Sequence, residues 1–288
     1  MCRRYFGSYQ YRMQRKLVWP ISWRCLSRRN FSPSSLDNKR EHIMLNSIKN
    51  FFDFSKKKSL QCIQHAVIPC DSYKEFMRLW HWDKEPGLSY LGKQPLAYHY
   101  PEDLNDRELH DAETLMALAC NIGQTAILEI GTSTGLTTLG FSRNAPNATV
   151  YTVDIPQKEA QEGKGGKLIT HILNPNDVGY HYKKAKVQNV HQIFANTATW
   201  KPDLPQLDLA FIDGCHDRKF VVNDTRKVLP FIKPGGFVVW HDASPDLIYK
   251  YHWIQEVCAA LGDLIKAGDI NSPLYHVHNS WTIVWKYI

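Results

Sequence analysis

Short apolar runs alternate with helix-like stretches from about residue 105 to the carboxyl terminus. The runs predict buried strands at 126–131, 148–155, 190–198, 207–214 and 236–242. Amphipathic segments predict helices at 104–123, 135–144, 216–233 and 245–262. Such alternation favours a doubly wound, mostly parallel α/β sheet. Two β-rich runs within 274–288 predict a closing antiparallel hairpin, so we expect seven strands.

The positive charge of the chain is concentrated at its amino end. Residues 1–60 contain 14 Lys and Arg against three acids, a net of +11, so the remaining chain carries +7 − 11 = −4. We expect residues 1–43 to be a basic, disordered extension or targeting segment. Residues 44–104 are then a helical or irregular appendage, and residues 105–288 form the main domain.

Three interpretations of the basic segment stay open. It is a disordered extension, or sequence translated upstream of a start at Met44. Alternatively, residues 1–31 are a mitochondrial transit peptide, because the segment is rich in Arg and has no acid before Asp37. The third interpretation is a nucleic-acid arm, in which Arg contacts phosphates and aromatic rings stack on bases.

Cysteine usage and hydropathy narrow the cellular setting. The seven cysteines are scattered and form no CxxC pair, which favours reduced thiols over a disulfide framework or a zinc site. No run approaches the ~18 apolar residues that cross a bilayer, so no membrane span is expected. We expect a cytoplasmic protein, or a mitochondrial one if the transit interpretation holds.

Two irregular stretches interrupt the regular pattern. Residues 71–100 are rich in Trp, Tyr and Pro, and packing on the main domain is favoured over contact with a substrate. Residues 156–189 are too long for an ordinary connection and contain Gly-Lys-Gly-Gly. We expect this second stretch to be a mobile surface insertion that lies over a cleft.

A glycine-containing turn follows the first predicted strand in ILEIGTSTGLTT, residues 127–138. Such a turn lets a ligand approach backbone N–H groups at a helix amino terminus, at the carboxyl edge of the sheet. A nicotinamide site would place glycine at the next two fingerprint positions, but the chain has Ser133 and Leu136 there. The fit to a dinucleotide is therefore poor.

A different pattern fits the same turn. Glu129 precedes it, and Asp154 ends the next strand, where an acid can accept hydrogen bonds from both hydroxyls of a ribose. The pattern hhEhGxxxG followed by hhxhD resembles the class I S-adenosylmethionine-dependent methyltransferases. Residues 211–242, FIDGCHDRKFVVNDTRKVLPFIKPGGFVVWHD, are similar to the small-molecule and sugar O-methyltransferase branch, where FIDGxHxxxxVxxD and PGGxxxxHD recur.

This resemblance covers about residues 105–288 and implies a Rossmann-like fold with S-adenosylmethionine as the cofactor. Asp154 would orient the ribose. The methionine part would be surrounded by residues of the glycine turn: Gly131, Thr132, Ser133 and Gly135. Glu129 would lie beneath that turn, and side chains at the end of the third strand, Asn196 and Thr197, would reach the adenine edge.

Asp213 and Asp242 end neighbouring predicted strands, so their carboxylates should converge near the cofactor. Two such carboxylates suit Mg²⁺, which would lower the pKa of a substrate hydroxyl. In catechol-type relatives Asn follows the second acid, but this chain has Ala243, and His241 or water is the alternative ligand. Metal dependence therefore stays open. It also stays open whether His241 is a metal ligand or a hydrogen-bond partner of the ligands.

His216 follows Asp213 by three residues in the DGxH motif. Neutral imidazole can take a proton near neutral pH, and in the sugar O-methyltransferases that this stretch resembles the matching histidine is proposed as the general base. The alternative is a histidine that only orients its loop. We expect Asp224 to make a structural hydrogen bond and Cys215 not to be a nucleophile. His276 and His278 are expected to be packing or surface residues.

The expected function is methyl transfer from S-adenosylmethionine to a hydroxyl of a small molecule, metal-assisted or not. His216 would take the proton, and Asp213 would act beside it as a metal ligand or polarising carboxylate. Formation of a homo-oligomer stays open. Two alternatives remain: a nicotinamide-dependent oxidoreductase on a similar sheet, and an RNA-directed methyltransferase that uses the basic amino-terminal segment.

Overall fold

A computed structural model describes residues 54–91, 106–123, 125–169, 172–271 and 273–288. The basic extension and the last part of the aromatic segment, residues 92–100, lie outside the described residues. All described residues belong to one compact unit that spans residues 49–288. The boundaries expected for the extension, the appendage and the main domain stay predictions.

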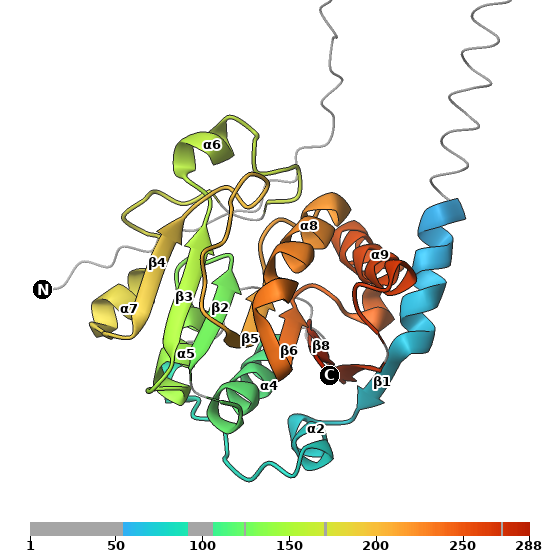
Figure 1. The fold of residues 1–288 in the computed structure, drawn as a ribbon, viewed down its shortest axis with the longest axis horizontal. Helices are drawn as coiled ribbons and strands as arrows, with labels where there is room; N and C mark the ends of the chain where they lie inside the picture. Colours follow the sequence, from blue (N-terminus) through green and yellow to red (C-terminus); the bar gives the residue numbers. More distant parts are fainter. Residues whose placement is uncertain (1–53, 92–105, 124, 170–171, 272) are drawn as a thin grey trace, which may run out of the picture. The chain divides into compact units, whose positions relative to one another are not determined.

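One sheet of eight strands, in the order β1-β7-β8-β6-β5-β2-β3-β4, forms the centre of this unit (Figure 1). The strands are β1 (Val67–Cys70), β2 (Ala126–Ile130), β3 (Thr149–Asp154), β4 (Val190–Phe194), β5 (Leu207–Ile212), β6 (Ile232–Trp240), β7 (Leu274–Val277) and β8 (Ile283–Lys286). Only β8 runs antiparallel to its neighbours, β6 and β7. The predicted Rossmann-like, mostly parallel sheet with a closing hairpin is confirmed.

Helices connect the strands and cover both faces of the sheet. They are α2 (Tyr73–Leu79), α4 (Arg107–Asn121), α5 (Leu136–Asn144), α6 (Gln157–Gln161), α7 (Tyr180–Ala185), α8 (Arg218–Val228) and α9 (His252–Ala267), with 3-10 turns η1 (Ser89–Leu91), η2 (Leu229–Phe231) and η3 (Pro245–Leu247). Residues 54–66 form a further helix before β1. The helices predicted from periodicity are present, but their ends differ by up to seven residues: α9 begins at His252 and not at 245, and α8 ends at Val228 and not at 233.

Two apolar clusters separate the faces because successive strand residues point in opposite directions. In β2, Leu128 and Ile130 join the cluster under α8, α9 and helical residues 54–66. Ile127 joins the cluster under α4 and α5. Every residue of β2 and β5 is buried, as expected for central parallel strands covered on both faces.

Two features differ from the sequence expectation. The sheet has an eighth strand, β1, which pairs in parallel with β7. Helix α9 continues past Gly262, the predicted end, and stops at Gly268, whose φ is 76°. A Cβ atom on Gly262 would lie 2.1 Å from the backbone oxygen of Ser59. Gly262 therefore serves close helix packing, whereas Gly268 has the left-handed conformation of a helix end.

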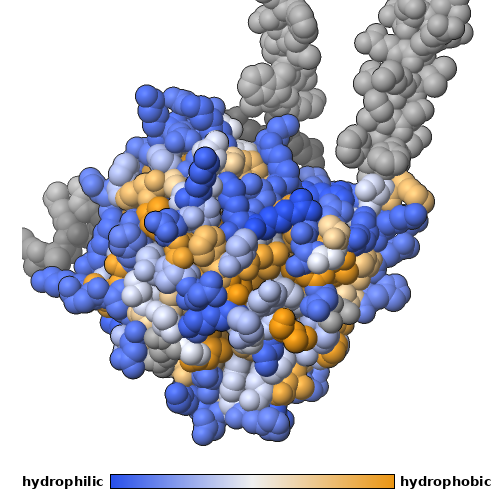
Figure 2. Space-filling model, in the orientation of Figure 1, coloured by the Kyte–Doolittle hydropathy of each residue, from blue (hydrophilic) through white to orange (hydrophobic). Residues whose placement is uncertain are grey.

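The described part of the aromatic segment, residues 71–91, packs on the sheet, as predicted. Trp80 and Trp82 lie edge-on to Phe237, with ring centroids 5.5 and 5.4 Å away. Such contacts add to the burial of the rings. Figure 2 shows a mostly hydrophilic surface on which apolar side chains gather across the middle of the face shown. Among the described residues, no helix is long and apolar enough to span a membrane.

Candidate active site

The strand order reverses between β2 and β5, since β3 and β4 extend the sheet on one side and β6 on the other. Ligands of open α/β sheets bind at such a switch point, beyond the carboxyl ends of the strands. Gly131 follows β2, and Asp213 follows β5. The sequence-predicted glycine turn and the predicted acid are therefore neighbours at this edge.

Both the backbone conformation and the lack of space for a side chain require glycine at position 131. Its φ is 103°, a value that side-chain-bearing residues rarely adopt. A Cβ atom at this position would lie 2.0 Å from the backbone oxygen of Asp213. This contact holds the glycine turn directly against the loop that carries Asp213.

We expect Gly131→Ala to lower the free energy of unfolding by about 3 kcal/mol or more, since a backbone clash adds to the strain of a positive φ. Urea denaturation measures this. Gly163→Ala is the matched control, because Gly163 has a φ of 72° with nothing within 4 Å of an added Cβ. Its loss should be only about 1–2 kcal/mol. Equal losses of unfolding free energy in the two variants would contradict the close contact between Gly131 and the backbone of Asp213.

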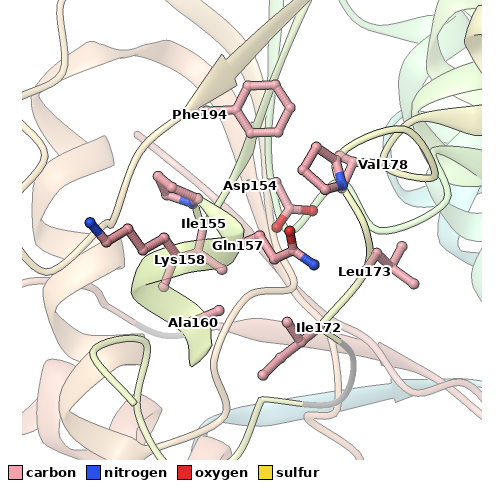
Figure 3. A pocket seen from close by; sticks show the side chains of 11 residues that line it. Asp154, Ile155, Gln157, Lys158, Ala160, Ile172, Leu173, Val178 and Phe194 are labelled. Atoms are coloured by element: carbon pink, nitrogen blue, oxygen red, sulfur yellow. The ribbon is translucent and has the colours of Figure 1, made fainter. Parts of the chain in front are cut away.

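Asp154 ends β3 and faces a cavity of about 330 Å³. One carboxylate oxygen, Oδ2, accepts a hydrogen bond from the backbone N–H of Ser133 at 2.9 Å, which ties the glycine turn to the acid. Figure 3 shows the carboxylate pointing into the space between Phe194, Gln157 and Val178. Residues of the 156–189 insertion line much of this cavity, as expected for a segment over a cleft.

Glu129 and Thr132 face away from the cavity edge, into a buried hydrogen-bond network. Thr138 and Thr152 both donate to Oε2 of Glu129, the second at 2.6 Å. The hydroxyl of Thr132 bonds that of Thr152 at 2.7 Å. This network joins β2, β3 and α5 beneath the glycine turn, and the direct contacts predicted between these two residues and the cofactor stay predictions.

Burial raises the pKa of Glu129 from 4.5 to about 8, although bonds from the two threonines oppose the shift. The folded chain therefore holds a proton that the unfolded chain releases near pH 4.5, so stability should fall as pH rises from about 4.5 to about 8. Glu129→Gln cannot ionise and should gain stability relative to the unsubstituted protein across that window. Thermal unfolding between pH 5 and 8 measures the difference, with exposed Glu162→Gln as the control. If the stability difference between Glu129→Gln and the unsubstituted protein does not change with pH, the raised pKa of Glu129 is contradicted.

Asn196 and Thr197 lie beyond β4, but other parts of the chain occupy their polar groups. The Asn196 amide donates to Glu159 of α6 at 2.9 Å and to the carbonyl of Lys164 at 3.3 Å. Asn196 lines a neighbouring cavity of about 630 Å³ and not the one that Asp154 faces. The backbone oxygen of Thr197 accepts bonds from Asn223 and Lys227. Their contacts with adenine stay predictions.

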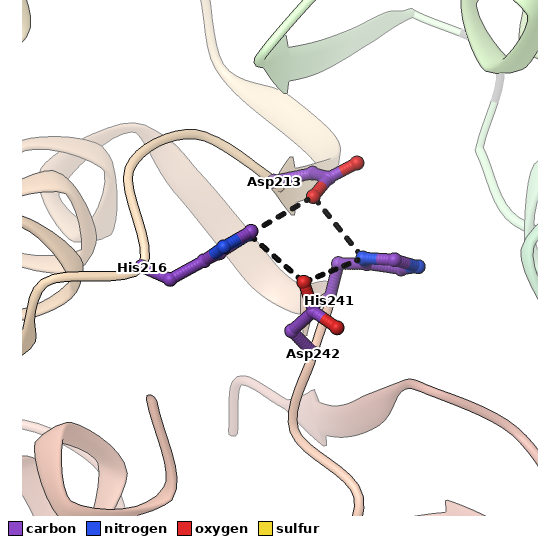
Figure 4. Close-up of side chains that lie close together, drawn as sticks. All are labelled: Asp213, His216, His241 and Asp242. Carbon is purple, nitrogen blue, oxygen red and sulfur yellow. Dashed lines mark ion pairs between the residues drawn. The ribbon is translucent and has the colours of Figure 1, made fainter. Parts of the chain in front are cut away.

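Four side chains converge beyond β5 and β6: Asp213, His216, His241 and Asp242 (Figure 4). Their ligand-type atoms all lie within 4.8 Å of one another. His216 Nε2 is 3.0 Å from Asp242 Oδ2, and His241 Nδ1 is 3.1 Å from Asp213 Oδ1. Asp242 has a φ of 52°, an uncommon conformation for a residue with a side chain, of the kind that concentrates at functional sites.

The charges of the cluster depend on each other. Burial opposes ionisation of Asp242, but His216 and His241 outweigh it and hold the pKa of Asp242 below its usual range. Burial likewise disfavours protonation of His241, but the two carboxylates outweigh it and raise the pKa of His241 well above its usual value. The carboxylates and imidazoles thus stabilise each other's charged forms.

The cluster is also short of hydrogen bonds. Six buried side-chain polar atoms of the described residues have no hydrogen-bond partner, and three of them gather here: Asp111 Oδ2, His216 Nε2 and His241 Nδ1. Buried polar atoms without partners are rare and often mark functional sites. The two carboxylates would suit the expected Mg²⁺, but the two imidazoles suit it poorly, because Mg²⁺ keeps oxygen ligands.

Asp111 is the residue of this site that the sequence interpretation missed. It lies on α4, is 6% exposed, and is 3.4 Å from His241 Nε2 through its Oδ2 atom. The sequence predicts only a helix for the segment that contains Asp111, residues 104–123. No motif distinguishes Asp111 from the other acids of that segment, because its place beside His241 depends on how α4 packs.

The remaining candidates have structural contacts. Asp224 accepts a bond from Asn223 at 2.8 Å, as expected for a structural role. Buried His276 contacts the backbone oxygen of Thr282 at 2.8 Å, and His278 is exposed. Burial raises the pKa of Cys215 to about 11, which argues against a thiolate nucleophile at neutral pH.

One known protein family matches the part of the chain that contains the candidate site. Residues 128–243 match the family model described as a methyltransferase domain. This part of the chain is similar to methyltransferase domains. The match begins in β2 and ends directly after Asp242, so it includes the glycine turn, Asp154 and the four-residue cluster, but not Asp111. The match agrees with the resemblance to methyltransferases that the sequence motifs predict.

Individual relatives share little sequence identity with this chain. An uncharacterized protein, R132 of Acanthamoeba polyphaga mimivirus, is 26% identical over 106 residues, which are 36% of this chain and 45% of that protein. The chain thus spans under half the length of that relative.

Two solved structures illustrate the similarity in structure. The O-methyltransferase NovP is 14% identical with a TM-score of 0.47, over 62% of this chain and 79% of NovP. The O-methyltransferase TomG of Streptomyces achromogenes, solved with S-adenosylmethionine, is 14% identical with a TM-score of 0.42, over 67% of this chain and 93% of TomG.

Proposed function

We propose that the chain transfers a methyl group from S-adenosylmethionine to a hydroxyl group of a small molecule. The observation that carries this proposal is the convergence of Asp213, His216, His241 and Asp242 beside the glycine turn of a region that matches methyltransferase domains. S-adenosylmethionine would supply an electrophilic methyl group on a positively charged sulfur. The chain itself would bind the donor, orient the acceptor and remove a proton.

Asp154 is the proposed partner of the ribose hydroxyls. Its Oδ2 atom already accepts the Ser133 N–H, and the carboxylate faces the cavity lined by Ile155 and Phe194. Apolar walls of this kind suit a flat purine, and a carboxylate at the end of the preceding strand suits a diol. Gly131, Ser133 and Gly135 would then flank the methionine part of the donor.

His216 is the proposed general base. It is 7% exposed, and its Nε2 atom faces the cluster without a hydrogen-bond partner among the described residues. A hydroxyl group needs such a base because it is a weak nucleophile while it keeps its proton. Asp242, 3.0 Å from Nε2, would stabilise the imidazolium that forms. This requirement favours a hydroxyl over an amine as the acceptor.

The test is a survey of acceptors with the full chain and S-adenosylmethionine that carries a labelled methyl group. Formation of S-adenosylhomocysteine and of a labelled product is followed by mass spectrometry. We expect turnover with hydroxyl-bearing small molecules such as sugars or phenols, and none with matched amines. Turnover of amines alone, or of RNA alone, would contradict the proposal.

A further inference from the structure

A short part of the 156–189 insertion lies against the loop that carries His216. The backbone N–H of Lys167 donates to Asp217 Oδ2 at 2.6 Å. The backbone N–H of His216 donates to the carbonyl of Leu168 at 3.2 Å. One bond therefore holds the residue proposed as the base, and the other holds the residue that follows it in the chain.

Two glycines let this part of the insertion pack closely on both of its neighbours. Gly166 has a φ of 100°, and a Cβ atom there would lie 2.5 Å from Cys215 Sγ. Gly165 is buried, and a Cβ atom there would lie 2.6 Å from Ile155 Cδ1. Ile155 lines the cavity assigned to the donor. The segment is thus packed between the wall of this cavity and the loop of His216.

The other end of the insertion supports the glycine turn. The N–H of Gly179 donates to the carbonyl of Ser133 at 2.8 Å, and the N–H of His181 donates to the carbonyl of Thr134 at 2.9 Å. One insertion therefore contacts both the turn assigned to the donor and the loop that carries the base. A general base acts only when it lies within hydrogen-bond reach of the proton that it takes, so contacts that fix this loop bear on the chemistry.

Asp217 supports the insertion and not its own helix. It is the N-cap residue of α8, but its side chain makes no capping hydrogen bond to that helix. An aspartate at this position usually accepts a bond from the first turn, whereas the Asp217 carboxylate accepts the Lys167 N–H. Substitution of Asp217 therefore releases the insertion without the loss of a helix cap.

We propose that residues 164–168, here called the strap, position His216 for proton removal, and that Asp217 is the positioning residue that holds the strap in place. Asp217 does not line the donor cavity and does not belong to the four-residue cluster, so it acts through His216. The effect on proton removal rests on the proposed function, but the hold of the strap on His216 does not.

The first test observes the His216 ring directly. NMR spectra of the full chain with ¹³C-labelled histidine show each ring, and His216→Ala identifies the His216 signal. We expect Asp217→Ala to shift or broaden this signal and to leave that of His276 unchanged. Asp217→Asn keeps an oxygen for the Lys167 N–H, so its His216 signal should stay near that of the unsubstituted chain. An unchanged His216 signal in Asp217→Ala would overturn the proposal.

The second test measures the consequence for methyl transfer. We expect Asp217→Ala to lower the single-turnover rate with a hydroxyl acceptor by roughly 10- to 100-fold, the effect of a small misplacement of a reacting group. Asp217→Asn should restore most of that rate. Affinity for S-adenosylhomocysteine should change little, because Asp217 does not line the donor cavity. A normal rate in Asp217→Ala, or an equal loss in both variants, would overturn the positioning role.

Gly166→Ala tests the same contact from the strap and covers the case in which Asp217→Ala does not fold. The added Cβ would lie 2.5 Å from Cys215 Sγ and 2.7 Å from Asp217 Oδ2, so it should push the strap away from the loop. We expect the His216 signal to shift and the rate to fall. Gly163→Ala is the matched control, because Gly163 also has a positive φ, 72°, but nothing lies within 4 Å of an added Cβ. Equal effects of the two substitutions would overturn the proposal.

These measurements separate the strap from the proposed function. If the unsubstituted chain transfers no methyl group but the His216 signal still depends on Asp217, the proposed function fails and the hold of the strap on His216 is supported. If methyl transfer proceeds but neither the His216 signal nor the rate depends on Asp217, the strap proposal alone fails.

Discussion

Asp154→Ala is expected to weaken binding of S-adenosylhomocysteine by roughly 100-fold or more. A carboxylate that accepts hydrogen bonds from both ribose hydroxyls would contribute about 1.5–3 kcal/mol per bond, and 1.4 kcal/mol corresponds to a tenfold change in affinity. The substitution also removes the acceptor of the Ser133 N–H at 2.9 Å, so the glycine turn loses its tie to β3. Isothermal titration calorimetry measures the affinity.

Two further variants make this result specific. Asp154→Asn keeps an acceptor for Ser133 but lacks the negative charge, so its affinity should lie between those of the unsubstituted chain and Asp154→Ala. Asp177→Ala removes an exposed carboxylate from the insertion near the same cavity and should leave the affinity unchanged. Near-normal affinity in Asp154→Ala would place the ribose elsewhere.

His216→Ala is expected to lower kcat by 10²- to 10⁴-fold, the usual contribution of a general base. Affinity for S-adenosylhomocysteine should change little, because the donor is assigned to Asp154 and the glycine turn. Single-turnover kinetics with an active hydroxyl acceptor measure the rate of the chemical step. Added imidazole should restore part of the activity, because it can enter the space left by the ring and accept the proton.

His276→Ala is the matched control for this loss. The two histidines are 7% and 6% exposed, so both substitutions open a similar space, but His276 contacts the backbone of Thr282 and not the cluster. We expect a loss of stability in both variants and a large loss of kcat only in His216→Ala. If both variants lose kcat equally and imidazole restores no activity to His216→Ala, His216 has a structural role and is not the general base.

The arrangement of the sheet was predictable where one residue pattern determines one element. Central strands such as Leu207–Ile212 are wholly apolar because helices cover both of their faces. Strand β1, Val67–Cys70, was not predicted, since its four residues, with two exposed, carry no alternation long enough to recognise. Gly262 was misread as a helix end because sequence alone does not show that another helix approaches its backbone.

The sequence predicted those residues of the candidate site that directly follow a strand. Asp213 and Asp242 follow adjacent parallel strands, so their meeting follows from topology alone. Asp111 comes from a helix more than 100 residues away in sequence, and only packing brings it to His241. Conversely, Asn196 follows β4 as predicted, but hydrogen bonds to the 156–189 insertion occupy its amide.

The central claim is that the cavity beside Asp154 accepts a methyl donor and not a dinucleotide. Calorimetric titration of the full chain with S-adenosylhomocysteine and, separately, with NAD tests it most directly. We predict one site for S-adenosylhomocysteine with a Kd on the order of micromolar, lost in Asp154→Ala, and no heat from NAD. Binding of NAD without binding of S-adenosylhomocysteine would contradict the account.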